Sequence, residues 1–486
     1  MLTKTDFYKV GHKFQYPKGT TMVFSNMTAR KSRMEGTEKV VFFGLTYYIN
    51  KYLIEGWNRE FFSEPLDEVV NLYKRKVDAC LQCDLDVSHI VSLHKLGYLP
   101  LEIHAIDEGT EVPIGVPMLV MWNTHPDHFW LTNYIETSMS ATLWGMCTSA
   151  TIALKYRRII KGWMEKAGGD LDFVNWQGHD FSFRGMFGIE AAAMSGAGHL
   201  LAFDGTDTIP AIELLEEHYN DGEPIVAGSV AATEHSVMCM GGKEDEIETY
   251  RRLITEVYPK GIVSIVSDTW DFWKLVTEGL PKLKDLIMSR DGKVVIRPDS
   301  GDPVKIICGD PEAKVGTPEY LGAFELLWTI FGGTVNKKGF KVLDPHIGLI
   351  YGDSITPERC EAIMSRLVGM GFVPSMVFGI GSYTYQYNTR DTFGFAIKST
   401  YGEVDGVGRD IFKDPKTDDG TKRSAKGLIA ASEDSDGNLT TWKIGNLNQL
   451  SDGASAMWSR FPDGVLSNAS SFNRVKDIRD RVREAS

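Results

Sequence analysis

The feature of the sequence that most constrains the fold is a short apolar run that ends in a charged loop, at Lys293–Pro303 (KVVIRPDSGDP). Val294–Ile296 have the continuous apolar character of a strand that is buried on both faces, as in parallel sheets. Arg297 follows with a planar fork of donors, and Asp299 adds a carboxylate two residues later, so the loop suits the phosphate and ribose oxygens of a sugar phosphate. The run therefore predicts a rigid strand that carries a binding loop.

The same pattern recurs along the chain. GIVSIVSD ends at Asp268, HIGLIYGD ends at Gly352 and Asp353, and PSMVFGIGS contains Gly379 and Gly381. Segments with helical character follow, such as DFWKLVTEGL and SITPERCEAIMSRLV. This alternation predicts a parallel α/β sheet or barrel with its site at the carboxyl ends of the strands. A single Asp after a strand is equally well explained as a helix cap, but the recurrence favours a site.

The rest of the chain indicates an α+β domain. LPLEIHAIDEGTEVPIGVPMLVMWNT contains short strands separated by Gly and Pro, and strand-like text returns near the C-terminus in GLIAAS and LTTWKIGN. A long helical pattern from FWLTNYIE to MEKAGG predicts two helices and a stop at Gly168. We predict an α+β domain over 1–165, an α/β barrel-like domain over 166–394, and a segment over 395–486 that completes the α+β domain.

Composition narrows the class of protein. The chain has 486 residues, 43% of them hydrophobic, and a formal charge of −13, which argues against a nucleic-acid surface. We see no long apolar run and no signal-peptide pattern, so we expect a cytoplasmic protein. Only Cys80 and Cys83 of the six cysteines are close in sequence, which is too few for a zinc site, and we assign no role to cysteine.

Several other positions carry polar chemistry, each with an ordinary structural alternative. Asp207 follows a short apolar run but would also cap the next helix, and Phe181 would also serve as core. His235 follows a small-residue strand, and a lone His is more often structural than catalytic. The basic cluster that includes Lys413 and Lys422 is by itself most simply a solvated loop. We find neither a dinucleotide-binding glycine motif nor a P-loop, so any phosphate site falls on the barrel loops.

One set of ordered motifs is more specific than any of these positions alone. TDFYKVGHKFQYP, VFFGLTYYINKYL, HDFSFRG, FDGTDT, AATEHS, VSIVSDTWD, IRPDSGDP, YGD, FGIGS, TRD and FKDP occur in this order over almost the full length. In this the sequence resembles the nicotinamide phosphoribosyltransferase family. The resemblance implies a type II phosphoribosyltransferase-like fold. The expected activity is transfer of the phosphoribosyl group of 5-phosphoribosyl 1-pyrophosphate to nicotinamide, giving nicotinamide mononucleotide and pyrophosphate in NAD salvage.

The resemblance also assigns roles to the pyridine-side residues. Phe181, with Tyr8 from the partner subunit, matches two rings that sandwich the pyridine, and Asp207 matches the carboxylate that accepts a carboxamide N–H. A carboxylate here favours nicotinamide over nicotinate, which would bring like charge and no N–H donor. Arg184 matches a residue around the nicotinamide and the phosphoribosyl group.

The remaining matches concern the phosphoribosyl group and its leaving pyrophosphate. Ribose-side and phosphoribosyl contacts are implied for Arg297, Asp299, Gly352, Asp353 and Gly381. Ser382, which follows Gly381, is a further candidate through its N–H and hydroxyl. Phosphate and pyrophosphate contacts, several of them from the other subunit, are implied for Arg30, Arg390, Lys398, Lys413 and Lys422.

Cofactors and partners follow from the same resemblance. It implies a homodimer with shared active sites, Mg²⁺ bound through pyrophosphate with Asp299 or Asp353 as candidate ligands, and ATP as an activating co-substrate that phosphorylates His235. Asp268 is expected to support positioning or the binding of metal-bound water. Neither a nucleic acid nor a membrane is expected as a partner.

The glycine-rich loop departs from the family pattern. The family text has a run of glycines where FGIGSYTY places Ser382 and Tyr383. These side chains predict a phosphate pocket of different shape without a change of reaction class. Nicotinate phosphoribosyltransferase activity, a non-catalytic nucleotide-binding homologue and another sugar-phosphate barrel enzyme are the alternatives.

Overall fold

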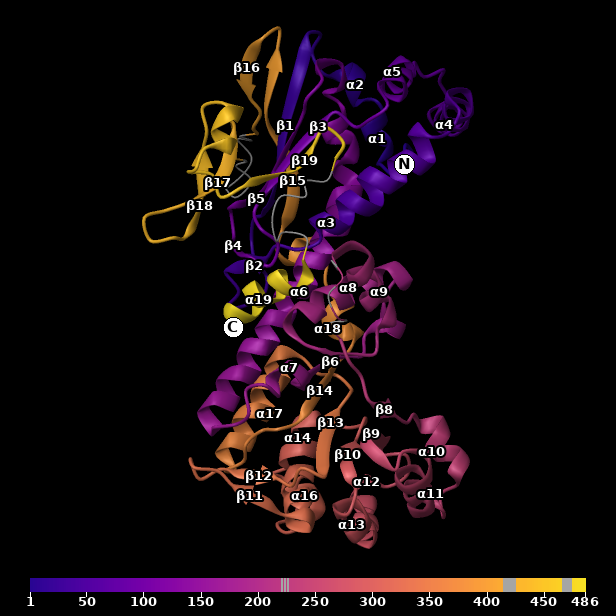
Figure 1. Cartoon of the computed structure of the whole chain (residues 1–486), viewed down its shortest axis with the longest axis vertical. Coiled ribbons are helices and arrows are strands. Elements are labelled where there is room, and N and C mark those ends of the chain that lie inside the picture. Colours follow the sequence, from indigo (N-terminus) through magenta and orange to yellow (C-terminus); the bar gives the residue numbers. More distant parts are fainter. Residues whose placement is uncertain (220–221, 223, 225–226, 414–424, 466–473) are drawn as a thin grey trace. The chain divides into compact units, whose positions relative to one another are not determined.

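The computed structural model of the chain describes residues 1–219, 222, 224, 227–413, 425–465 and 474–486. Its contacts divide into two units (Figure 1). Unit 1 comprises Met1–Thr148, Leu214–Glu223 and Asn388–Ala485, and unit 2 comprises Ser149–Glu213, Pro224–Tyr387 and Ser486. The domain limits at 165/166 and 394/395 stay a prediction, because these units are defined by contacts and not by independent folding.

Unit 1 is built on an antiparallel sheet that takes strands from both ends of the chain. Its order is β16 (Val407–Asp410), β15 (Phe395–Val404), β1 (Thr20–Ala29), β5 (Pro117–Asn123), β3 (Leu101–Ala105) and β19 (Trp458–Pro462). β1 pairs with β15 over almost its whole length, from Thr20 opposite Val404 to Ala29 opposite Phe395. The predicted α+β architecture built from both chain ends is therefore confirmed.

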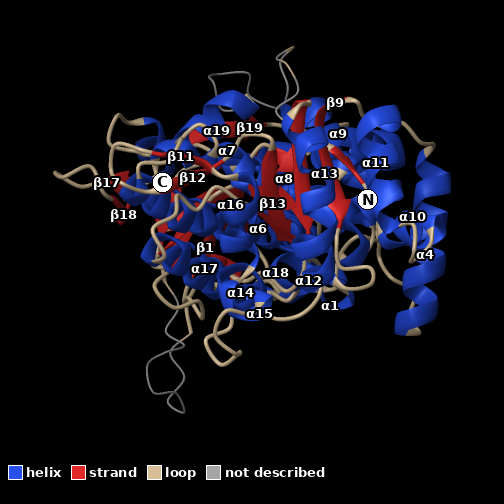
Figure 2. Ribbon diagram, turned by 90° about the horizontal axis from the view of Figure 1, so that it is seen from below, coloured by secondary structure: helices blue, strands red, loops and turns tan. Residues whose placement is uncertain are grey.

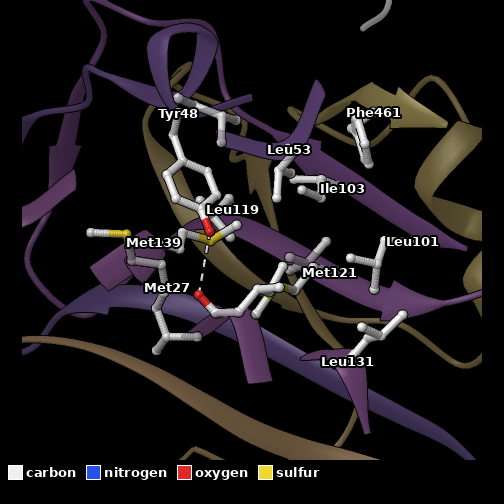
Figure 3. Close-up of a cluster of buried hydrophobic side chains, with 14 of the residues drawn as sticks. Met27, Tyr48, Leu53, Leu101, Ile103, Leu119, Met121, Leu131, Met139 and Phe461 are labelled. Atoms are coloured by element: carbon white, nitrogen blue, oxygen red, sulfur yellow. Dashed lines mark hydrogen bonds between the residues drawn. The ribbon is translucent and has the colours of Figure 1, made fainter. Parts of the chain in front are cut away.

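Large apolar side chains cover one face of this sheet. Figure 3 shows Leu119 and Met121 of β5 beside Leu101 and Ile103 of β3, with Tyr48 and Leu53 from the segment after β2 packed over them. All of these side chains are at most 3% exposed. Burial of this kind contributes about 1.5–3 kcal/mol for each large side chain, so the cluster is a main source of the stability of unit 1.

The other elements of unit 1 are short apart from α4. They are α1 (Phe7–Val10), α2 (His12–Gln15), β2 (Lys39–Val41), α3 (Leu45–Tyr48), η1 (Ile49–Gly56), η2 (Asn58–Phe62), α4 (Leu66–Leu81), α5 (Ser88–Leu96), β4 (Glu111–Pro113), η3 (Pro126–His128), η7 (Arg390–Thr392), β17 (Ile429–Glu433), β18 (Leu439–Lys443), η8 (Leu447–Ser451) and α19 (Val475–Glu484).

The long helical pattern forms one helix, α6 (Leu131–Ala167), and the prediction of two helices is wrong. Its central stretch is rich in Ser, Thr and Gly, which lowers helix propensity. The hydroxyls of Thr142 and Thr148 instead donate to the carbonyls of Ser138 and Trp144, at 2.9 and 2.7 Å, so they are satisfied without a break in the helix. The predicted stop at Gly168 is confirmed, and the first boundary between the units falls within α6.

Unit 2 contains the predicted parallel sheet. Its order is β7 (Gly205–Thr206), β6 (Gly178–Asp180), β14 (Val377–Ile380), β13 (Ile347–Tyr351), β10 (Asp291–Arg297), β9 (Lys260–Val266) and β8 (Ala231–Ala232). Every neighbouring pair is parallel. The strands predicted at the four apolar runs are all present, and the α/β prediction is confirmed.

A short segment joins the two edges of this sheet. Gly228 forms a parallel bridge with Gly205 of β7, and its N–H and C=O bond to Asp204 O and Thr206 N at 2.8 and 3.0 Å. Ala231 and Ala232, only three and four residues later, pair with β9. Both edges are therefore linked through residues 228–232, and the sheet closes in the manner of a barrel.

Figure 2 draws helices in blue and strands in red. Helices follow the strands of unit 2 along the chain, and the helix after β7 continues into unit 1 from Leu214. They are α7 (Val174–Gln177), η4 (Phe183–Gly185), α8 (Ile189–Ala202), α9 (Ile209–Tyr219), α10 (His235–Gly241), α11 (Glu246–Arg252), η5 (Leu253–Val257), α12 (Phe272–Lys274), η6 (Leu275–Gly279), α13 (Leu280–Met288), α14 (Pro303–Cys308), α15 (Pro318–Leu321), α16 (Ala323–Phe331), α17 (Pro357–Gly369) and α18 (Ser382–Gln386); β11 (Gly333–Val335) and β12 (Lys341–Leu343) form a separate hairpin. Among the described residues, no helix combines the length and the apolar character needed to span a membrane.

Candidate active site

A large cavity lies at the carboxyl ends of the barrel strands in unit 2. Its volume is about 1040 Å³, and the loops after β6, β7, β8, β10, β13 and β14 all contribute to its lining. The lining residues are Phe181, Phe183, Arg184, Asp207, Glu234, His235, Ser236, Arg297, Asp299, Gly352, Asp353, Ser354, Gly381, Ser382 and Tyr383. The predicted site residues from unit 2 thus line one cavity, apart from Asp268, which contacts it through His235.

The ring of Phe181 lies against a surface made by two glycines. A Cβ atom on Gly379 would stand 2.4 Å from a ring carbon of Phe181, and one on Gly352 would stand 3.1 Å from the same ring. Gly379 lies in β14 and Gly352 follows β13, so two neighbouring strands leave room for the ring. Because any larger residue would displace it, these glycines determine where an aromatic ligand can stack.

Asp207 follows β7, and its carboxylate is held from two sides. Oδ1 accepts hydrogen bonds from His179 Nε2 and from Ser229 Oγ, each at 2.8 Å. Burial opposes ionisation of this group, but the hydrogen bond and charge of His179 and the hydrogen bond of Ser229 outweigh it and lower the pKa of Asp207. In the described part of the chain Asp207 accepts no hydrogen bond from a backbone N–H of α9, so its geometry favours a site carboxylate over a helix cap.

A second cavity of about 470 Å³ shares Phe181, Asp207 and Arg297 with the first and continues among inward-facing residues of the strands. Ser264 lines it, and the Ser264 hydroxyl is buried without a hydrogen-bond partner among the described residues. Phe173 also lines this cavity. The site therefore extends from the strand ends into the barrel interior.

A second group of charged side chains surrounds Asp299. Burial raises the pKa of Asp299, and the nearby carboxylates of Asp268 and Asp353 add to the rise, while Arg297 opposes it. Asp353 Oδ2 accepts the hydroxyl of Ser354 at 2.7 Å, and Ser354 holds a φ of +55°. A left-handed backbone at a non-glycine residue costs free energy and is typical of functional loops.

The loop of Arg297 separates two carboxylates with different tasks. Asp302 is the helix cap, since its Oδ1 accepts the N–H groups of Val304 and Lys305 at the start of α14. Asp299, three residues earlier, is thereby left to face the cavity. The cap interpretation thus holds for one Asp of this motif and not for the other.

His235 is the first residue of α10 and contacts a buried carboxylate. Its Nε2 lies 3.1 Å from Asp268 Oδ1, and its side chain is 48% exposed while that of Asp268 is 5% exposed. Asp268 Oδ2 accepts the N–H of Asp299 at 2.9 Å. The imidazole is therefore oriented by a fixed acceptor and open on its other side, which suits a nucleophile better than a packed structural histidine.

The departure from the family pattern affects the wall of the cavity. A Cβ atom on Gly185 would stand 2.0 Å from Ser382 Oγ, so the Ser382 side chain packs against the loop after Arg184. Tyr383 lines the cavity and stacks on Tyr387, with ring centroids 5.2 Å apart and an interplanar angle of 8°. Both tyrosines are more than half exposed, so they add an aromatic edge without filling the pocket.

The predicted phosphate-binding residues of unit 1 form a cluster of their own. Burial lowers the pKa of Lys398, and the positive charges of Arg30, Lys413 and Arg390 lower it further, against the opposing effect of Glu136. Mutual repulsion of this kind is expected where cations gather to bind an anion. Lys422 lies outside the described residues.

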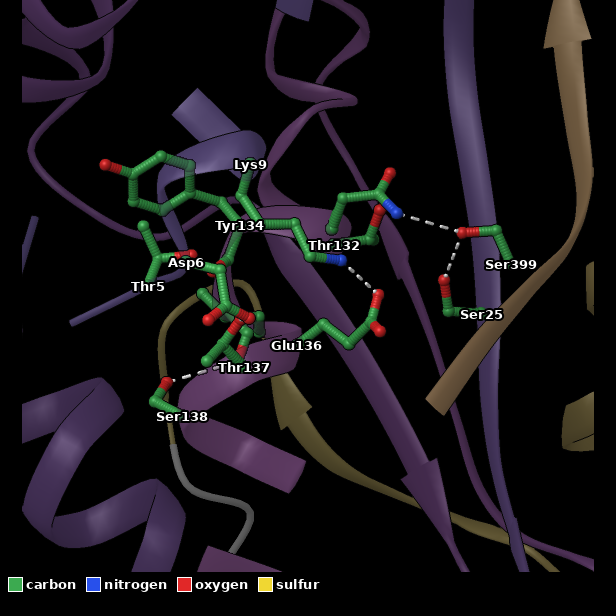
Figure 4. A network of polar contacts seen from close by, with 12 residues as sticks. Thr5, Asp6, Lys9, Ser25, Thr132, Tyr134, Glu136, Thr137, Ser138 and Ser399 are labelled. Carbon is green, nitrogen blue, oxygen red and sulfur yellow. Dashed lines mark hydrogen bonds and ion pairs between the residues drawn. The ribbon is translucent and has the colours of Figure 1, made fainter. Parts of the chain in front are cut away.

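Tyr8 lies on the short helix α1, which is anchored to α6 by polar contacts (Figure 4). Thr5 donates to Tyr134 O at 2.8 Å, Lys9 Nζ contacts Glu136 at 2.7 Å, and Asp6 accepts from Thr137 at 2.8 Å. Lys9 is buried, whereas Tyr8 is 60% exposed. The ring of Tyr8 is therefore exposed on a segment whose position is fixed by polar contacts to α6.

Sequence reasoning missed the two residues that hold Asp207. His179 belongs to the quoted motif HDFSFRG, but its role depends on the pairing of β6 with β7, which sets His179 opposite Gly205. Ser229 lies in the segment that closes the sheet. Glu234, Ser354 and Phe183 also line the cavity without having been predicted.

Comparison with known families covers most of the chain. The model of the nicotinate phosphoribosyltransferase (NAPRTase) family matches residues 176–446, and that of the nicotinamide phosphoribosyltransferase N-terminal domain matches residues 1–103. The first match contains, in full, all seven strands of the parallel sheet described for unit 2. The second contains Tyr8 and Arg30.

Curated relatives match over about nine tenths of the chain. The chain is 55% identical over 449 residues to the nicotinamide phosphoribosyltransferase of Acinetobacter baylyi, covering 90% of this chain and 89% of the relative. It is 33% identical to the nicotinamide phosphoribosyltransferase of Mycoplasma pneumoniae, covering 88% and 94%.

Two solved structures share the fold at low sequence identity. Nicotinate-nucleotide pyrophosphorylase from Pyrococcus furiosus has a TM-score of 0.57 at 14% identity and covers 99% of this chain and 93% of its own. Human nicotinic acid phosphoribosyltransferase has a TM-score of 0.55 at 15% identity and covers 98% and 93%. The type II phosphoribosyltransferase-like fold is therefore confirmed.

Proposed function

The chain belongs to the nicotinate phosphoribosyltransferase family and carries the N-terminal domain of the nicotinamide phosphoribosyltransferases, and on this premise we propose that it is a nicotinamide phosphoribosyltransferase. It transfers the phosphoribosyl group of 5-phosphoribosyl 1-pyrophosphate to nicotinamide. The products are nicotinamide mononucleotide and pyrophosphate, which makes this a salvage reaction towards NAD.

The observation that carries the choice of acceptor is the carboxylate of Asp207 beside the ring of Phe181. Both line the two cavities that meet at the strand ends. Phe181 offers a face for the pyridine, and an ionised Asp207 accepts a carboxamide N–H. Nicotinate would bring a second negative charge to this carboxylate without a donor, so nicotinamide is the better ligand.

The bond changes require positioning more than acid or base catalysis. The pyridine nitrogen forms a bond to C1 of the ribose while the bond from C1 to the pyrophosphate oxygen breaks, and its electron pair leaves with pyrophosphate. The nitrogen has no proton to lose, so no general base is needed. Phe181 and Asp207 orient the acceptor, Arg184 and Arg297 contact the phosphoribosyl group, and Asp299 and Asp353 hold the ribose side.

Mg²⁺ is part of this proposal. Within the described residues there is no group of three or more His, Cys, Asp or Glu side chains arranged to hold a metal ion. The cavity does contain Asp299 and Asp353, and burial, with the nearby carboxylates of Asp268 and Asp353, raises the pKa of Asp299. This donor set fits Mg²⁺, which usually binds one or two carboxylates together with substrate phosphates. When bound, the ion supplies positive charge for the leaving pyrophosphate.

We further propose that ATP activates the enzyme through His235. The contact between His235 and Asp268 supports this role, because a carboxylate that accepts from one imidazole nitrogen leaves the lone pair of the other free. That nitrogen takes the γ-phosphoryl group of ATP, the bond to the β-phosphate oxygen breaks, and ADP leaves. The cavity lining supports the phosphohistidine, since Arg297 lies in the same cavity.

A homodimer with shared sites completes the proposal. The outward-facing Tyr8 supports a second ring for the pyridine in the partner's site, and the cluster of Arg30, Arg390, Lys398 and Lys413 supports a source of phosphate contacts. The cytoplasm is proposed as the location, in keeping with six cysteines that are all free thiols.

The experiment that tests the function measures product formation from phosphoribosyl pyrophosphate and Mg²⁺, with nicotinamide or nicotinate as acceptor, each with and without ATP. We expect mononucleotide from nicotinamide, with enhancement by ATP. Preference for nicotinate would overturn the role of Asp207 and make the protein a nicotinate phosphoribosyltransferase. Absence of product from both acceptors would favour a non-catalytic nucleotide-binding homologue.

A further inference from the structure

The two hydrogen bonds at Asp207 fall on a single oxygen. His179 Nε2 and Ser229 Oγ both lie 2.8 Å from Oδ1, and none of the described residues donates a hydrogen bond to Oδ2. The Asp207 side chain is 47% exposed, and the residue lines both cavities. One oxygen is therefore held by the protein, and the other is available to a ligand.

The direction of these bonds follows from the charge of Asp207. The pKa of this carboxyl is lowered, so it is ionised at neutral pH and can only accept. His179 Nε2 must therefore carry a hydrogen and donate, as must the hydroxyl of Ser229. The arrangement therefore fixes the tautomer of His179, with a hydrogen on Nε2. Both donors, from His179 and from Ser229, are directed at the same oxygen, Oδ1.

The position of His179 is set by the geometry of the strand. His179 lies in β6 and Phe181 directly follows it, so the two side chains point to the same face. Both line the second cavity, with ring centroids 5.0 Å apart and planes at 61°. A Cβ atom on Gly205 would stand 2.7 Å from His179 Nδ1, so the neighbouring strand leaves the space that the imidazole occupies. The His179 side chain is only 10% exposed.

The imidazole thus contacts both groups that face the pyridine. The imidazole packs against Phe181, the residue proposed to stack on the pyridine. Its Nε2–H donates to Asp207, the residue proposed to bind the carboxamide. We propose that His179 and Ser229 are positioning residues for substrate specificity: they turn Asp207 so that Oδ2 faces the carboxamide N–H of nicotinamide. This inference rests on the proposed function, and it assigns the choice of acceptor to three residues and not to the carboxylate alone.

The orientation of the Asp207 carboxylate is well defined because its two donors come from different parts of the barrel. His179 comes from β6, Asp207 follows β7, and Ser229 lies in the closing segment, so three successive parts of the barrel rim meet at Oδ1. Two charge-assisted hydrogen bonds from different directions leave the carboxyl group little freedom to rotate. A carboxylate without them would turn between several orientations, of which only some present an acceptor to the carboxamide.

The test compares steady-state constants for nicotinamide, nicotinate and phosphoribosyl pyrophosphate in four variants. His179→Ala and Ser229→Ala remove a donor, whereas His179→Gln and Ser229→Thr keep one. We expect each alanine variant to raise KM for nicotinamide about tenfold, the effect of one hydrogen bond to a charged group, with KM for phosphoribosyl pyrophosphate unchanged. The ratio of kcat/KM for nicotinamide to that for nicotinate falls, and Gln and Thr restore most of the loss.

A matched control separates positioning from a general effect on the fold. His346 also pairs with a carboxylate, that of Asp344 at 2.7 Å, but it lines neither cavity. His346→Ala should leave the KM for nicotinamide unchanged. Ser229 is exposed, so Ser229→Ala keeps the test valid even if His179→Ala fails to fold.

The outcomes distinguish failure of the proposed function from failure of the positioning role of His179 and Ser229. A wild-type protein that uses no nicotinamide would overturn the proposed function. A wild-type protein that uses nicotinamide, together with alanine variants whose KM for nicotinamide is unchanged or rises in step with that for phosphoribosyl pyrophosphate, would overturn only the positioning role.

Discussion

The Nε2 atom of His235 lies 3.1 Å from Oδ1 of Asp268, and the second oxygen of Asp268 binds the loop of Asp299. The same carboxylate therefore orients the imidazole and supports the ribose-side loop. In the proposed reaction this couples the residue that ATP modifies to the residues that hold the sugar phosphate.

Asp268→Asn tests that coupling. The amide can keep its oxygen for the N–H of Asp299 and then turns an NH₂ group towards His235, so the imidazole must accept where it now donates. We expect the ATP enhancement of activity to fall about tenfold, with ATP-independent activity largely kept, and acid-labile phosphate on the protein to fall with it.

Asp271→Asn is the matched control. Asp271 caps α12 by accepting the N–H of Lys274, and it does not contact His235. Because Asn and Asp are comparable N-caps, this substitution should leave the free energy of unfolding close to that of the wild type and the ATP response intact. An undiminished ATP response in Asp268→Asn would contradict the coupling.

Gly379→Ala should displace the ring of Phe181. The added Cβ would stand 2.4 Å from a ring carbon, which is well inside van der Waals contact. We expect KM for nicotinamide to rise about tenfold, with a loss of unfolding free energy of about 1–3 kcal/mol from overpacking. Steady-state kinetics and chemical denaturation measure the two effects.

Gly369→Ala serves as the comparison for this substitution. Gly369 ends α17, and a Cβ atom there would meet nothing within 4 Å. Kinetics should be unchanged and stability equal or higher by up to about 1 kcal/mol. If Gly379→Ala binds nicotinamide as the wild type does, the glycine surface does not position Phe181.

Lys398→Met should separate binding from stability. The charges of Arg30, Lys413 and Arg390 act against the charge of Lys398, so its removal relieves repulsion in unit 1. We expect unchanged or higher thermal stability but a KM for phosphoribosyl pyrophosphate raised about tenfold, more at low than at high salt. Lys305→Met, whose Nζ pairs with Asp310 at 3.1 Å in unit 2, should leave this KM unchanged. An unaltered salt dependence in Lys398→Met would argue against a phosphate contact.

His89 should make unit 1 sensitive to acid. Burial lowers the pKa of His89 to about 4. Between about pH 6.5 and 4 the unfolded chain binds a proton at this residue and the folded chain does not, so stability is complete above the upper limit and falls as pH decreases. The loss is on the order of 3 kcal/mol at pH 4.

His89→Phe tests this dependence, since a phenyl ring can keep the edge contact with Trp130, now at a centroid distance of 4.8 Å. Denaturation at pH 7 and pH 4.5 should show a smaller difference in the variant than in the wild type. His94→Gln, on the same helix but partly exposed, should keep the wild-type difference. An equal pH dependence in His89→Phe and wild type would contradict the assignment.

Local patterns predict those parts of the fold that depend on neighbours in sequence. Four strands could be predicted from an apolar run followed by a polar loop, because the pattern for each strand lies within one segment. They end at or near Arg297, Asp268, Asp353 and Gly381. The site at their carboxyl ends follows from the parallel arrangement, and the structure brings these residues into one cavity.

What local patterns do not predict depends on pairing between distant segments. The bond from Ser229 to Asp207 exists only because residues 228–232 lie between β7 and β9. The length of α6 was missed because its hydroxyls bond within the helix, which composition alone does not indicate. The cation cluster around Lys398 joins residues more than 350 positions apart, from Arg30 to Lys413, through the pairing of β1 with β15.

The closing segment has a consequence for local unfolding. β10 and β9 pair over seven residues, from Asp291 to Arg297, whereas β7 and β8 have two residues each. β7 and Gly228 pair through a single bridge, so few backbone bonds hold the seam where Asp207 and Ser229 meet. Amide hydrogens at this seam should exchange with solvent through the lowest-energy opening of the barrel, and a nicotinamide that spans Asp207 and Phe181 should slow that exchange. The seam of the barrel that determines substrate specificity is then also the part of the barrel that substrate binding stabilises most.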